Sequence, residues 1–229
     1  MNFYFSFGIF LFFVCFILIP TFSTGSSSSK KNDSKKQEKE KIEVVAIDCE
    51  MVGINSDGKG NMLARVSIVN SEGVTIYDNF VKPTKEITNY RTAVSGVRPQ
   101  DIENGELFSK VKNDVSEILK GKLLVGHALV NDFRVLKISH PKRMIRDTST
   151  YWEFKQLTDG RIPSLKRLTS HFLGVNIQEG EHSSVQDAKA TLQLYMLVRE
   201  NWESMLKNRK SRPRKGNKSI GSKHKQSNN

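Results

Sequence analysis

The segment VVAIDCEMVG, residues 44–53, decides the fold because it is a buried strand that ends in acidic residues. Four apolar residues lead to Asp48, and Glu50 follows after one cysteine. Side chains alternate between the two faces of a strand, so Asp48 and Glu50 point to the same side. Two such carboxylates repel each other unless they share a cation, and Mg²⁺ takes oxygen ligands of this kind. The pair therefore predicts a metal-binding end of a core strand.

The rest of the chain supplies further strands and several helices. Alternating apolar residues predict a hairpin of two strands, over residues 63–71 and 73–83, joined by a Glu-Gly turn. Shorter apolar runs predict strands over residues 122–128 and 143–149. Helical spacing and helix-end signals predict helices over residues 105–121, 129–138, 164–174 and 183–206. This order predicts an α/β fold with a mixed central β-sheet flanked by α-helices.

Composition and charge narrow the classes of protein that fit. The two cysteines among the 229 residues, Cys15 and Cys49, form neither a disulfide framework nor a CxxC metal site. The formal net charge is +12, but residues 207–229 carry nine Lys or Arg and no acid, which leaves about +1 for residues 44–206. A basic tail fits contact with nucleic-acid phosphates, and a solubilising tail is the alternative.

Four segments are expected along the chain. Residues 1–22 form an apolar signal-like or anchor segment, although lysines follow the apolar run instead of preceding it. A wrongly assigned gene start is the alternative for this segment. Residues 23–41 are expected to be a disordered polar linker, residues 42–206 the folded domain, and residues 207–229 a basic disordered tail.

Two later motifs add acids and a histidine. In LLVGHALVNDFRVL, apolar residues lead to Gly126 and then to Asp132 near a helix start, where an ordinary helix cap is the alternative. In EHSSVQDA, Asp187 lies in the first turns of the last helix, and His182 precedes it by five residues. That spacing puts His182 on the loop before the helix, leaning over a site that Asp187 enters. An isolated histidine would otherwise be structural or exposed.

Together, the D-x-E strand, the GHxxxND element and the H-x4-D motif resemble the DEDDh superfamily of 3′→5′ exonucleases, which have a ribonuclease H-like fold. The resemblance covers residues 43–203, and all five signature positions are filled. The strings DCEMVG, ARVSIVN, YRTAVSGV, PSLKRL and EHSS are similar to the RNA exonuclease 4 group, which includes the interferon-stimulated exonuclease. The expected fold is therefore the ribonuclease H-like exonuclease fold.

The resemblance implies a reaction and a role for each signature residue. It implies two divalent metal ions, Mg²⁺ or Mn²⁺, both contacted by Asp48. Glu50 and Asp187 would hold the ion beside the attacking water, and Asp132 the ion beside the leaving oxygen. His182 would accept the proton of that water as general base. The products would be nucleoside 5′-monophosphates, and no small-molecule cofactor is expected.

Three further residues are candidate substrate contacts. Met51 follows the acidic pair and could lie against the last base or ribose, with core packing as the alternative. Arg91 could reach a phosphate or a 2′-hydroxyl, with a surface salt bridge as the alternative. His127 is expected to shape the pocket.

The expected partner is single-stranded RNA, because a terminal nucleotide must enter a closed pocket. A DNA-directed 3′→5′ exonuclease with the same residues and a catalytically silent RNA-binding protein are the alternatives. The resemblance implies ribosomal RNA processing in the nucleus or nucleolus. The basic tail agrees with that location, and the apolar N-terminus suggests the alternative: the endoplasmic reticulum, a membrane tether or secretion. The sequence predicts no oligomeric state.

Overall fold

The computed structural model describes residues 42–211. The predicted segments 1–22 and 23–41, and the tail from residue 212 onward, lie outside the described residues. Within residues 42–211, every helix is too short or too polar to cross a membrane.

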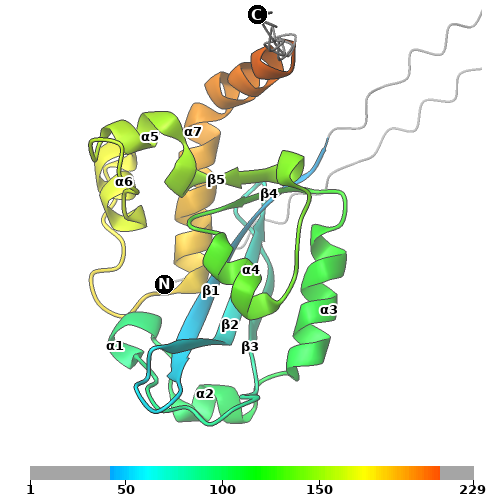
Figure 1. The fold of residues 1–229 in the computed structure, drawn as a ribbon, viewed down its shortest axis with the longest axis vertical. Helices are drawn as coiled ribbons and strands as arrows, with labels where there is room; N and C mark the ends of the chain where they lie inside the picture. Colours follow the sequence, from blue (N-terminus) through cyan, green and yellow to red (C-terminus); the bar gives the residue numbers. More distant parts are fainter. Residues whose placement is uncertain (1–41, 212–229) are drawn as a thin grey trace, which may run out of the picture. The chain divides into compact units, whose positions relative to one another are not determined.

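A mixed five-stranded sheet forms the centre of the domain, as the sequence predicts (Figure 1). Its strands are β1 (Val44–Ile54), β2 (Gly60–Asn70), β3 (Thr75–Phe80), β4 (Leu123–Gly126) and β5 (Ile145–Asp147). The order across the sheet is β3-β2-β1-β4-β5. The first three strands are antiparallel neighbours, whereas β4 and β5 run parallel to β1. The acidic strand β1 is therefore central, with a neighbour on each side.

Seven α-helices are present among the described residues. They are α1 (Thr92–Ser95), α2 (Pro99–Glu103), α3 (Phe108–Leu119), α4 (Val130–Leu136), α5 (Trp152–Gln156), α6 (Leu165–Leu173) and α7 (Ser184–Ser211). The predictions of α3, α4, α6 and α7 are confirmed, and α7 continues beyond the boundary predicted at residue 206. The sequence did not reveal α1, α2 and α5, because helices of four or five residues are too short to show a helical period.

Two apolar layers cover the two faces of the sheet. Val44 and Ala46 of β1 pack with α5, α6 and α7 on one face. Val45, Ile47 and Cys49 pack with α3 and α4 on the other. The strand period of two that buries Val44 and Ala46 beneath α7 also directs Asp48 and Glu50 to the α7 face. The acidic pair thus lies where the start of α7 can meet it.

Candidate active site

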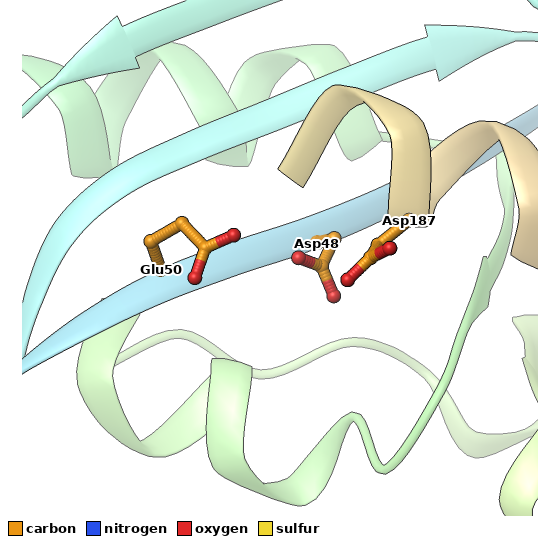
Figure 2. Close-up of side chains that lie close together, drawn as sticks. All are labelled: Asp48, Glu50 and Asp187. Atoms are coloured by element: carbon orange, nitrogen blue, oxygen red, sulfur yellow. The ribbon is translucent and has the colours of Figure 1, made fainter. Parts of the chain in front are cut away.

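Three carboxylates gather at the end of β1, beneath the start of α7 (Figure 2). Asp48, Glu50 and Asp187 each offer an oxygen, and these oxygens lie within 4.8 Å of one another. Glu50 and Asp187 are buried, with 6% and 3% of their surface exposed, and Asp48 is half-buried. In Figure 2 the carboxylates of Asp48 and Asp187 face each other, and Glu50 lies further along the strand. The structure therefore brings together three of the predicted metal ligands.

A buried hydroxyl pair fixes the start of α7 against the sheet. Ser67 on β2 and Ser184, the first residue of α7, are both fully buried, and their Oγ atoms lie 2.6 Å apart. Ser67 also donates to Asp78 Oδ1 at 2.8 Å. Asp187 then follows within the first turn of the helix, where its backbone N–H donates to Ser183. This contact between β2 and α7 places Asp187 over β1.

Two buried oxygens of the cluster have no hydrogen-bond partner among the described residues. They are Oε1 of Glu50 and Oδ1 of Asp187. A buried polar atom without a partner is costly, and a buried carboxylate oxygen more so. Carboxylate oxygens are the ligands that hard divalent cations take. The cluster therefore fits a bound Mg²⁺ or Mn²⁺, which would engage both oxygens.

The electrostatics of the cluster agree with that fit. Burial, and then the neighbouring carboxylates, raise the pKa of Asp48 well above its usual range. Burial and the charge of Asp187 raise the pKa of Glu50 to about 8, although the guanidinium of Arg65 opposes the shift. Burial also raises the pKa of Asp187. The metal-free cluster therefore keeps protons at pH values where solvent-exposed carboxylates would have lost them. A divalent ion that binds the carboxylates would displace these protons.

Asp132 approaches the cluster from the other face of the sheet. It is 5% exposed and lies on α4, near the start of the helix as predicted. Burial raises the pKa of Asp132 to about 7, and its hydrogen bond with the Cys49 thiol partly offsets this. The charge of Asp132 in turn raises the pKa of Asp48, which indicates that the two carboxylates are near each other. The pairing of β4 with β1 ends at Ala46, which leaves that edge of β1 open to α4.

His182 lies on the loop before α7, as predicted, and faces the acidic cluster. Its Nδ1 is 3.9 Å from Oδ2 of Asp187. Its backbone N–H donates to the carbonyl of Val94 in α1 at 2.8 Å. Gly96, which has φ +65°, packs so closely that an added Cβ would lie 2.9 Å from the carbonyl oxygen of His182. The short helix α1 therefore supports the histidine loop, a role that no sequence motif announced.

Gln178 is a second supporting residue that sequence reasoning missed. Its Nε2 donates to Oδ2 of Asp187 at 2.6 Å, the oxygen that also faces His182. Its own backbone carbonyl accepts from Nζ of Lys166 at 3.0 Å. One oxygen of Asp187 is thus held by Gln178, and the other is left for a cation. The only sequence signal for this role is the position of Gln178, nine residues before Asp187 on an irregular loop. That signal is weak.

Comparison with known proteins agrees with this geometry. A family model described as "Exonuclease" (RNase_T) matches residues 45–195, well over half of the chain.

The chain belongs to this exonuclease family.

Named relatives place it in the RNA exonuclease 4 group. RNA exonuclease 4 of Mus musculus is 50% identical over 167 residues, which are 73% of this chain and 39% of the relative. RNA exonuclease 4 of Debaryomyces hansenii is 46% identical over 184 residues, which are 80% of this chain and 67% of the relative. The chain thus covers well under half of the mouse relative's length.

Solved exonuclease structures share the fold. An RNA exonuclease module of Pan2 from Saccharomyces cerevisiae, solved with A7 RNA, has a TM-score of 0.62 at 35% identity over 73% of this chain and 30% of that chain. The Pan2 catalytic unit of Neurospora crassa has a TM-score of 0.62 at 26% identity, over 77% of this chain and 31% of that chain. The domain therefore has the predicted ribonuclease H-like exonuclease fold.

The three predicted substrate contacts of this exonuclease domain have different surroundings. Met51 is half-buried and packs against the core on the α3–α4 face. His127 places Nδ1 3.0 Å from Oγ1 of Thr148, and burial lowers the pKa of its imidazole. Their contacts with substrate remain predictions.

Arg91 is committed to the loop between β1 and β2. Its guanidinium donates to Asn61 Oδ1 at 2.7 Å and to the carbonyl of Gly58 at 2.7 Å. The residue itself has φ 52°, an uncommon backbone conformation for a residue with a side chain. Arg91 thus braces the tip of the hairpin, and any contact with RNA would add to these bonds.

Proposed function

We propose that this chain is a 3′→5′ exoribonuclease that releases nucleoside 5′-monophosphates from single-stranded RNA. The observation that carries the proposal is the cluster of Asp48, Glu50 and Asp187, in which two buried oxygens have no partner within residues 42–211. The family membership and the names of the relatives support the exonuclease activity and the choice of RNA.

The five signature residues have distinct places in this proposal. Asp48, Glu50 and Asp187 would hold one divalent ion, and Asp48 and Asp132 would hold a second. Bound Mg²⁺ or Mn²⁺ supplies charge that stabilises the pentavalent phosphorus and makes water a better nucleophile. Asp132 comes from α4 and Asp187 from the first turn of α7, so two different helices would supply metal ligands.

His182 would act as general base. Its Nδ1 faces Asp187, so its Nε2 is the atom available to accept a proton from the attacking water. Asp187 would stabilise the resulting imidazolium, as an adjacent carboxylate does for a catalytic histidine. The 3′ oxygen of the penultimate nucleotide then leaves with the shortened RNA. Gln178 and α1 hold Asp187 and His182 in place for this step.

Ribosomal RNA processing in the nucleus is the cellular role that we propose. The basic residues of the predicted tail 207–229 support a compartment rich in nucleic acid. The apolar residues 1–22 favour the endoplasmic reticulum, a membrane tether or secretion instead. A fluorescent tag at the C-terminus tests the proposal, because a reticular or secreted signal would exclude the nucleus.

The activity is tested with RNA and DNA of one sequence, each labelled at its 5′ end. The protein is incubated with each strand in Mg²⁺ and in EDTA, beside an Asp48→Asn variant. We expect a ladder that shortens from the 3′ end of RNA, and no ladder in EDTA or with the variant. Faster shortening of DNA would favour the DNA-directed alternative. Binding without shortening of either strand would favour the silent RNA-binding protein.

A further inference from the structure

A pocket lined by four basic residues lies on the α3–α4 face, beside the start of β2. Its volume is about 110 Å³. Lys82 and Lys85 come from the segment after β3, Arg134 comes from α4, and Lys137 lies at the C-terminal cap of α4. Phe108, the first residue of α3, adds an aromatic ring to the wall. We call this site, defined by these four cations and Phe108, the basic pocket.

The four cations have no acidic partners among residues 42–211. No carboxylate of those residues lies within 4.0 Å of any of them, and all four residues are exposed. The nearby Glu106 pairs instead with Lys110, and Lys137 Nζ lies 5.3 Å from the ring centroid of Phe108. Four unpaired cations around one hollow make a site of positive potential, to which an anion is attracted.

This pocket and the metal cluster are built on some of the same elements. Leu63, which lines the pocket, is the register partner of Met51, the residue after Glu50. Arg134 lies on α4, the helix that carries Asp132, and Lys137 lies at its C-terminal cap. Four cations thus gather on the α3–α4 face, whereas the three carboxylates of the metal cluster lie beneath α7. One sign suits metal ions and the other suits phosphates.

We propose that the basic pocket binds phosphates of the RNA strand on the 5′ side of its terminal nucleotide, which rests on the exoribonuclease activity proposed above. A strand that places its last phosphate between Asp48 and Asp132 continues past α4, where Arg134 and Lys137 lie. Lysine and arginine bind phosphate without reading sequence, and Phe108 gives a ring against which a base can pack. The pocket thereby favours strands of several nucleotides over dinucleotides.

The test compares two charge-matched pairs of substitutions in the full chain. Arg134→Gln with Lys137→Gln removes two cations of the pocket. Lys142→Gln with Arg143→Gln removes the same two residue types from the exposed 3₁₀ turn before β5, at the opposite end of the parallel strands. Both proteins keep residues 207–229, so the contribution of the tail to binding is the same in each.

Two measurements are made on each protein. The first is the affinity for a 5′-fluorescein 12-nucleotide RNA in EDTA, titrated over a range of salt by fluorescence anisotropy. The pocket variant should bind about tenfold more weakly, and its log–log salt slope should fall by about 1.4, or about 0.7 for each lost phosphate contact. The second is hydrolysis in Mg²⁺, where its kcat/KM for the 12-mer should fall about fivefold or more relative to that for a dinucleotide.

The outcomes separate the pocket from the activity. If both pairs of substitutions weaken binding equally, or if the salt slope of the pocket variant is unchanged, the pocket proposal is overturned. Hydrolysis of RNA by the wild type would still support the nuclease activity in that case. A wild type that binds RNA through the pocket but never shortens it would overturn the nuclease alone. A second pocket pair, Lys82→Gln with Lys85→Gln, should reproduce the weaker binding, and its failure to do so would confine the site to α4.

Discussion

Replacing Glu50 by glutamine should stabilise the metal-free protein, because this buried carboxylate destabilises the fold when it ionises. Glu50 is 6% exposed, and burial together with the charge of Asp187 raises its pKa from 4.5 to about 8. The unfolded chain releases this proton at the lower value, and the folded chain holds it until the higher one. The folded state therefore binds more protons between these two values, so its stability falls as the pH rises through that window.

The size of the effect follows from the same pKa. At about pH 8 the ionisation of Glu50 lowers the free energy of unfolding by about 4 kcal/mol, since one pKa unit corresponds to about 1.4 kcal/mol. Water and structural relaxation screen a buried charge, and we therefore expect about 2 kcal/mol, or a rise of about 4–8 °C in Tm. At about pH 5 the gain should shrink to less than about 1 kcal/mol, because the penalty has only begun to develop there.

Thermal unfolding in EDTA measures this gain for the Glu50→Gln protein at the two pH values. Glu200→Gln is the matched control, because Glu200 is exposed on α7 and its loss should change stability by less than about 0.5 kcal/mol. Adding Mg²⁺ at the higher pH should stabilise the wild type more than the variant, which has lost a ligand. If Glu50→Gln is no more stable than wild type at about pH 8, the account of the cluster as a strained, cation-requiring site is refuted.

Three further predictions concern the groups that support the cluster. Gln178→Ala should lower the single-turnover rate constant of RNA cleavage about tenfold or more, because it frees the Asp187 oxygen that Gln178 holds, whereas Gln156→Ala on α5 should not. His182→Gln should lower the rate of RNA cleavage by a factor of about 100 or more, yet the protein should still bind Mn²⁺, as measured by calorimetry. If the affinity for Mn²⁺ fell by the same factor as the rate, His182 would not act as a general base. Gly96→Ala should reduce activity more than Gly121→Ala, because both glycines have positive φ but only Gly96 packs against His182. Equal losses of activity would show that α1 does not support the histidine loop.

The sequence predicted the parts of the site that depend on local periodicity. A strand period of two was enough to put Asp48 and Glu50 on one side, and the structure adds only which helix covers that side. The same holds for Asp132 near a helix start and for His182 on the loop before the last helix. These features follow from a few neighbouring residues, so no tertiary information is needed.

The supporting contacts could not be predicted because they join residues far apart in the chain. Ser67 and Ser184 are separated by 117 positions, and each serine alone is unremarkable. The sequence left Arg91 either in contact with substrate or in a surface salt bridge, and it did not reveal that the guanidinium donates to Asn61 and Gly58, about thirty residues earlier. The basic pocket was hidden for a related reason: its four cations come from two segments about fifty residues apart, and the net charge near zero over residues 44–206 does not show that they gather.

The most direct test of the central claim is to locate metal ions in the site itself. Crystals of the protein soaked in Mn²⁺ and measured at the manganese absorption edge would give an anomalous map. The account predicts one peak among Asp48, Glu50 and Asp187 and a second between Asp48 and Asp132, both absent from an Asp48→Asn protein. A map with no peak at the cluster, from a protein that shortens RNA in the same Mn²⁺ concentration, would contradict it.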